Sequence, residues 1–169
     1  MFHRTVDNKT VDVCDIAYVS DCSTAQCGMY EMALKAICEK TQKRTAKVER
    51  WLWHGTSYDV SQTIIRNGFD RTYSTVAKYG KGTYFARDAD YSAVERYSPT
   101  HSDGYQYMLL CRVIVGDSVV GSSGNNVMAL KPNGDEYDTR VDNLTNPSIF
   151  VVWRDYRAMA VYLIKFKHK

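Results

Sequence analysis

The sequence lacks three features that would each point to a particular class of protein. No run of apolar residues approaches the roughly 18 to 20 that cross a bilayer, and residues 1–10 are polar rather than signal-like. The five cysteines are an odd number, and their spacings match neither a disulfide framework nor a zinc site. We therefore expect free thiols in a reducing compartment, no metal and no membrane association.

These absences predict an intracellular protein, cytoplasmic or nuclear in a eukaryote. Export by a route without a signal peptide stays an open alternative. The sequence also has little excess charge: 22 Lys and Arg stand against 19 Asp and Glu, a formal net charge of +3, and the charges are scattered. This pattern argues against a dedicated nucleic-acid stripe, although it would not repel an anionic ligand. Lys81 lies between glycines, but the chain has no Gly-x-x-x-x-Gly-Lys-Ser/Thr phosphate loop.

The length of 169 residues suits one domain, which we expect to span residues 1–169. No internal repeat, low-complexity segment or linker divides it. Apolar runs predict strands at 11–19, 49–54, 82–86, 105–115, 149–153 and 161–166. Helical patterns lie mainly in the first half and strands mainly in the second, so the predicted fold class is α+β.

Three helices are expected from their start and stop signals. The first follows Ser23 and Thr24, either of which could cap it, and buries an apolar face of Tyr30, Leu34, Ile37 and Cys38. The second is capped by Asp59 and ends at Gly68, where a positive φ is wanted. The third covers residues 88–97 and stops before Pro99.

The most informative residues lie at two strand ends. An apolar strand ends in His54-Gly55, and a Gly-rich turn at residues 79–82 leads into a strand that carries Tyr84. Together these elements would place an imidazole, bare backbone and a phenol around one cleft. Such a cleft suits a flat aromatic amide and a ribose better than a metal or a phosphate alone.

Five stretches of the chain, in order, carry a resemblance to a known family. They are Leu-Trp-His-Gly-Thr-Ser at 52–57, Asn-Gly-Phe at 67–69, Tyr-Gly-Lys-Gly-Thr-Tyr-Phe-Ala at 79–86, Tyr-Ser-Ala at 91–93 and Asn-Pro-Ser-Ile-Phe-Val-Val at 146–152. The chain resembles the catalytic domain of the diphtheria-toxin-like ADP-ribosyltransferases, in the poly(ADP-ribose) polymerase branch. The resemblance implies split antiparallel sheets with flanking helices, a cleft for NAD+ as co-substrate, and no regulatory helical domain within this chain.

The resemblance also implies roles for individual residues. The family's catalytic triad corresponds to His54, Tyr84 and Ile149. His54 would hold a hydroxyl of the adenosine-side ribose, and Tyr84 would lie against the nicotinamide ring.

Further NAD+ contacts are implied for four residues near this triad. The backbone of Gly55 and the hydroxyl of Ser92 would bind the carboxamide, and Tyr97 would close the other face of the ring. For Thr56, contact with the ribose competes with a hydroxyl that satisfies the local turn.

Ile149 stands where polymerising members of the family carry Glu. An aliphatic side chain cannot activate the hydroxyl of an ADP-ribose acceptor for chain growth. We therefore expect a monomer that transfers one ADP-ribose to a protein acceptor, with the chain itself as a further acceptor. An acidic side chain on the acceptor would supply the missing charge.

Other functions stay open at this stage. The chain could be a catalytically silent NAD+-binding or interaction module, although His54, Tyr84, Ser92 and Tyr97 are all present. It could also transfer ADP-ribose to water or to a nucleic-acid end, whereas an RNA 2′-phosphotransferase is disfavoured because that family has His where Tyr84 stands. The loops at 71–78 and 118–126 are expected to select the acceptor and do not reveal it.

Overall fold

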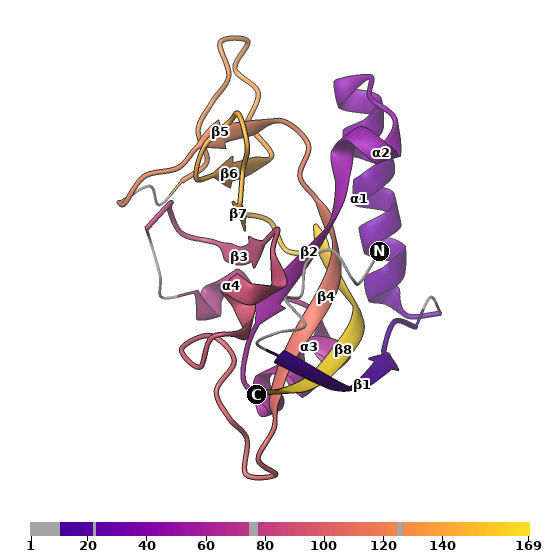
Figure 1. Ribbon diagram of the computed structural model, residues 1–169. Coiled ribbons are helices and arrows are strands. Elements are labelled where there is room, and N and C mark those ends of the chain that lie inside the picture. Colours follow the sequence, from indigo (N-terminus) through magenta and orange to yellow (C-terminus); the bar gives the residue numbers. More distant parts are fainter. Residues whose placement is uncertain (1–10, 22, 75–77, 125–126) are drawn as a thin grey trace.

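The computed structural model describes residues 11–21, 23–74, 78–124 and 127–169. Its strands are β1 (Val11–Tyr18), β2 (Glu49–Gly55), β3 (Thr83–Ala86), β4 (Gln106–Ile114), β5 (Ser118–Val120), β6 (Thr139–Val141), β7 (Ile149–Val152) and β8 (Ala158–His168). Its helices are α1 (Ala25–Thr41), α2 (Thr45–Val48), α3 (Tyr58–Asn67) and α4 (Ala89–Ala93), with the 3-10 turn η2 (Arg71–Tyr73). The strands form an eight-stranded sheet in the order β1-β8-β4-β2-β3-β7-β6-β5, and the helices pack around it (Figure 1).

The sheet consists of two halves that join at one narrow point. Strands β1, β8, β4 and β2 form the first half, and β3, β7, β6 and β5 form the second. Between β2 and β3 the ladder has a single residue pair, Trp53 opposite Ala86. The predicted α+β fold with split sheets is thus confirmed, except that β5 runs parallel to β6.

The two faces of the sheet are covered by different helices. Because side chains alternate along a strand, Leu52 and Phe85 lie on the face that α3 covers, here called the α3 face. Trp53 and Ala86 lie on the other, the α4 face. The α3-face core contains Leu52, Ile64, Phe69, Phe85, Leu109, Cys111, Val113, Val141, Phe150 and Val152. The α4-face core contains Trp53, Ala89, Ala93, Met108, Leu110, Ile164 and Phe166.

Helix α1 packs through the face that the sequence predicts. Thr24 caps the helix by accepting a hydrogen bond from the Cys27 backbone N–H. Tyr30, Leu34 and Ile37 are buried against Val48 and Ile114, with Cys38 half-buried beside them. The Tyr30 hydroxyl donates to Glu49 at 2.7 Å, and burial, followed by this bond, raises the pKa of Tyr30. The periodic apolar face is therefore confirmed.

Two predicted helix boundaries are wrong. Ser57, rather than Asp59, caps α3, because the Ser57 hydroxyl accepts from the Val60 N–H. Helix α4 covers Ala89–Ala93 rather than residues 88–97. The helix ends early because the backbone of Val94 is extended, with a ψ of 145°. The N–H groups of Tyr97 and Ser98 then donate to the Val94 carbonyl in a separate turn. The predicted positive φ at Gly68 is confirmed, at 81°.

The two loops expected to select an acceptor each contain a short regular element. Ser118–Val120 forms strand β5, and Arg71–Tyr73 forms η2. The remaining parts of these loops include residues 75–77 and 125–126, which lie outside the described residues. Within the described part of the chain, Cys14, Cys38 and Cys111 are free thiols, and no helix is long and apolar enough to cross a membrane.

Replacing Leu34 with Ala tests the packing of α1. Leu34→Ala removes a buried side chain between the helix and the sheet, and we expect it to lower the free energy of unfolding by about 2 to 5 kcal/mol. Met32→Ala is the matched control, because Met32 is 74% exposed on the same helix and its loss should change stability by less than about 0.5 kcal/mol. Urea unfolding followed by circular dichroism measures both, and equal effects would contradict this packing.

Candidate active site

His54 lies at the point where the two half-sheets separate. Its side chain projects on the α3 face, where its ring makes edge contact with Phe69 at 5.2 Å between centroids and also packs on Phe85. Its Nδ1 lies 2.8 Å from the carbonyl oxygen of Tyr84 on β3. The His54 side chain therefore bonds to β3 just beyond the Trp53 and Ala86 pair, where the backbone ladder between β2 and β3 has ended.

This contact fixes the protonation of the imidazole. A carbonyl oxygen can only accept a hydrogen bond, so Nδ1 of His54 must carry the proton. Burial lowers the pKa of His54, which favours the neutral ring. In a neutral ring with Nδ1 protonated, Nε2 is a hydrogen-bond acceptor. His54 therefore offers an acceptor to a hydroxyl group, and its ring is held by a strand and two aromatic side chains.

The side chain of Tyr84 is held by two hydrogen bonds of its hydroxyl. The Tyr84 Oη donates to the Gly80 carbonyl at 2.7 Å and accepts from the Tyr79 N–H at 2.9 Å. Burial raises the pKa of Tyr84, so the phenol stays protonated and keeps the first of these bonds. The Gly-rich turn thus fixes the phenol ring, which lies on the α4 face beside Ala86, Ile149 and Val151.

At Gly55, β2 comes very close to the last turn of α4 and to the turn that follows it. A Cβ at Gly55 would lie 2.5 Å from the Ser92 carbonyl oxygen and 2.8 Å from the Tyr97 Cβ, so no larger residue fits without movement. Ser92 is buried, and its hydroxyl has no hydrogen-bond partner among the described residues. Tyr97 stacks on Tyr91 at 5.0 Å, with their hydroxyls 3.0 Å apart.

Ile149 is buried at the start of β7, on the same face as Tyr84. Asp142 holds this position: its carboxylate accepts hydrogen bonds from the Ser148 N–H, the Ser148 hydroxyl and the Ile149 N–H. The loop is also tied to the end of β3, because Arg87 donates to Asn146 at 2.6 Å. These three bonds hold the Asp142 carboxylate against the chain at Ser148 and Ile149.

The structure therefore gathers most of the predicted residues into one region. His54 bonds to the β3 backbone from the α3 face, whereas the side chains of Tyr84 and Ile149 lie together on the α4 face of the same strand pair. Gly55, Ser92 and Tyr97 meet at the end of β2. The side chain of Thr56 is buried, and it makes no hydrogen bond within the described residues. Thr56 follows Gly55 in the sequence, and no described contact links its side chain to the other predicted residues.

The sequence reasoning missed the residues that support this region. Arg140 on β6 lies opposite Val151, which lies opposite Tyr84, so the three form one row on the α4 face. Arg140 is only 2% exposed and donates to the Val127 carbonyl, while burial lowers its pKa. Its place between Thr139 and Val141 in a short apolar strand was the available signal. Asp142 and Arg87 gave no such signal, because charged residues in turns are ordinary.

The residues present fit a nicotinamide and ribose. The Gly55 backbone lies against the Ser92 backbone, and the Ser92 hydroxyl has no partner among the described residues, so both groups could pair with a carboxamide. The Nε2 of His54 can accept from a ribose hydroxyl. Among the described residues, no group of three or more His, Cys, Asp or Glu side chains could hold a metal ion. The expectation of no metal nevertheless stays a prediction.

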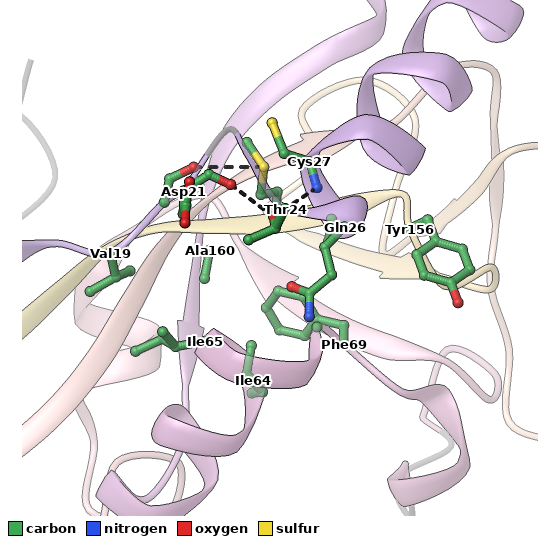
Figure 2. Close-up of a pocket in the computed structure, with 14 residues that line it drawn as sticks. Val19, Asp21, Thr24, Gln26, Cys27, Ile64, Ile65, Phe69, Tyr156 and Ala160 are labelled. Atoms are coloured by element: carbon green, nitrogen blue, oxygen red, sulfur yellow. Dashed lines mark hydrogen bonds between the residues drawn. The ribbon is translucent and has the colours of Figure 1, made fainter.

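A separate pocket of about 50 Å³ lies between the start of α1, the end of α3 and β8 (Figure 2). Gln26, Phe69 and Tyr156 lie around it, and none of the predicted site residues lines it. This volume holds only a few water molecules. We therefore do not place the active site there.

Comparison with known proteins identifies the family. A sequence model of the poly(ADP-ribose) polymerase catalytic domain matches residues 2–136. The chain belongs to this family. The match includes His54, Gly55, Tyr84, Ser92 and Tyr97 and ends before Ile149.

Relatives within the family are named as mono-transferring enzymes. The chain is 35% identical over 143 residues to mouse "Protein mono-ADP-ribosyltransferase PARP10", covering 82% of this chain and 15% of the relative. It is 39% identical over 127 residues to human "Protein mono-ADP-ribosyltransferase PARP14", covering 70% of this chain and 7% of the relative. The chain thus spans a small part of these longer proteins.

A solved structure shows the same fold. The PARP domain of Arabidopsis RADICAL-INDUCED CELL DEATH1 superposes with a TM-score of 0.77, covering 94% of this chain and 89% of that chain. Its sequence identity is 22%, so the likeness concerns the fold.

The lowered pKa of His54 predicts a pH dependence of stability. Its native pKa lies below the ordinary 6.5, so the unfolded chain binds this proton more readily. As the pH falls from 6.5 towards the native pKa, His54 should reduce the free energy of unfolding, by less than about 1.4 kcal/mol per pH unit. Urea unfolding of the native chain and of His54→Gln, at several pH values between 7 and 5, measures this contribution. The variant should show the shallower loss, and equal slopes would contradict the neutral, Nδ1-protonated assignment.

Proposed function

We propose that this chain is an NAD+-dependent mono-ADP-ribosyltransferase that cleaves the nicotinamide–ribose bond and transfers one ADP-ribose to a protein acceptor, including itself. The observation that carries this proposal is the hydrogen bond from His54 to the Tyr84 carbonyl, which leaves Nε2 as an acceptor beside the Gly55 backbone. The printed names of the mouse and human relatives support the same activity.

The proposed binding of the nicotinamide end follows from three groups. The Gly55 backbone and the Ser92 hydroxyl pair with the carboxamide, and Tyr84 lies against the ring. Tyr97, braced by its stack on Tyr91, closes the site on another side. Each aromatic contact contributes about 0.5 to 1.5 kcal/mol beyond the burial of its area. His54 holds a hydroxyl of the adenosine-side ribose and so fixes the extended dinucleotide.

To cleave the nicotinamide–ribose bond, this site mainly has to hold the substrate in the reactive orientation. When the bond between the ribose carbon and the nicotinamide nitrogen breaks, its electron pair leaves with nicotinamide, which becomes neutral. The ribose becomes an oxocarbenium-like cation, which the acceptor oxygen attacks. Fixed donors and acceptors around the leaving group lower the barrier because they need no reorganisation during the step.

Ile149 decides which acceptors are suitable. A hydroxyl acceptor must lose a proton to a base, and Ile149 offers none. A carboxylate acceptor is already ionised at neutral pH, so it can attack without a base. We therefore propose Asp or Glu side chains as acceptors, and one transfer rather than chain growth.

A second candidate is a catalytically silent module. Arabidopsis "Probable inactive poly [ADP-ribose] polymerase SRO5" is 28% identical over 109 residues, which cover 64% of this chain. The chain therefore also resembles a protein that is named as a probable inactive polymerase. Against this reading, His54, Tyr84, Ser92 and Tyr97 are all present in one region.

Labelled NAD+ distinguishes the two candidates. Incubated with purified protein and a cell lysate, it should give discrete, unsmeared labelled bands on a gel, with release of free nicotinamide in the same tube. His54→Ala and Tyr84→Ala should each lose the label by at least about tenfold, since each removes a contact worth about 1.4 kcal/mol or more. Tyr18→Ala, at an exposed tyrosine on β1, is the matched control and should label normally.

The other outcomes separate the alternatives. Nicotinamide release without labelled protein would point to hydrolysis or a nucleic-acid acceptor, and no release would point to the silent module. Mass spectrometry of the labelled bands should place the modification on Asp or Glu. Replacing the mapped residue should remove the label, and undiminished modification would disprove the acidic acceptor.

A further inference from the structure

A cavity of about 180 Å³ lies away from the proposed active site, on the α3 face of the sheet. Its walls come from α2, the start of β2, the segment between β4 and β5, and the loop between β6 and β7. Lys47, Arg50, Ser118 and Thr145 line it around the buried ring of Phe150. This volume is more than ten times the roughly 15 Å³ that a single water needs, so a tetrahedral oxyanion fits.

The charged residues that line this cavity are all basic. No acidic residue lines it. The Arg50 guanidinium lies over the Phe150 ring at 5.5 Å, which orients its planar donors. Within the described residues, neither Lys47 nor Arg50 makes an ion pair. The hydroxyls of Ser118 and Thr145 likewise have no side-chain hydrogen bond there and can serve as donors.

Four other basic residues in this part of the fold form ion pairs with acidic residues. Lys43 and Lys131 both bind the carboxylate of Asp117, at 2.5 and 2.6 Å. Lys40 and Arg157 both bind the buried Asp138. Lys47 and Arg50, in contrast, have no acidic partner among the described residues, so their charges are available to a ligand in the cavity.

We propose that this cavity binds a phosphate group, with Lys47 and Arg50 as its counter-charges and Ser118 and Thr145 as hydrogen-bond donors. Two cations and two hydroxyls match a dianionic oxyanion with several acceptor oxygens. The site is separate from His54 and Tyr84, and its occupation does not depend on cleavage of NAD+. The phosphate group could be free or could belong to a phosphorylated side chain.

Titration with inorganic phosphate, followed by amide chemical shifts of the full chain, tests the site. We expect saturable shifts at Gly116, Ser118 and Thr145, and at least about tenfold weaker binding in the Lys47→Gln/Arg50→Gln double variant. Both side chains are exposed, so the variant should keep its thermal midpoint. Lys167→Gln, at an exposed lysine on β8, is the matched control. Raising the ionic strength from about 0.01 to about 0.15 M should weaken binding.

Acetate at matched ionic strength, a phosphoserine peptide and the same peptide without phosphate complete the test. Tighter binding of the phosphopeptide than of phosphate would assign the group to a protein, and equal binding would assign it to a free phosphate. Either result supports the site. Equal shifts with acetate or with the unmodified peptide, or binding that survives in the double variant, would overturn it.

Discussion

The hydrogen bond between the His54 ring and the Tyr84 carbonyl is the contact on which the proposed site depends. It joins β2 to β3 where their backbone pairing stops after Trp53 and Ala86. A continuous ladder would fill this place with backbone hydrogen bonds. A complete separation would leave Tyr84 and Gly55 in unrelated halves of the molecule. The Trp53 and Ala86 pair and the shared α3-face core join the halves, and beyond them this side-chain bond connects β2 to β3 without a backbone ladder.

The rest of the site depends on supports that face this bond. Gly80 and the Tyr79 backbone hold the Tyr84 phenol, and Asp142 holds the start of β7 at Ile149. Gly55 allows α4 and the turn after it to come close, which brings Ser92 next to the end of β2. These groups are held by hydrogen bonds and close packing, as an enzyme that works by orientation requires.

Much of this arrangement could be predicted from sequence, for identifiable reasons. Tyr30, Leu34 and Ile37 repeat with helical spacing, and Gly68 stands where only a positive φ continues the chain, so these positions carry their own local signal. The site residues were found because a family pattern marks them. The split between β2 and β3, the buried Arg140 and the caps by Ser57 and Asp142 depend on contacts between distant segments or between competing polar side chains. The spacing of residues within a short stretch of sequence does not predict such contacts.

A crystal structure with a non-hydrolysable NAD+ analogue would test the central claim most directly. The account predicts the Nε2 of His54 within about 3 Å of a ribose hydroxyl, with Nδ1 still bonded to the Tyr84 carbonyl and the carboxamide against the Gly55 backbone. An analogue whose ribose lies away from His54, or a His54 ring turned from Tyr84, would contradict it.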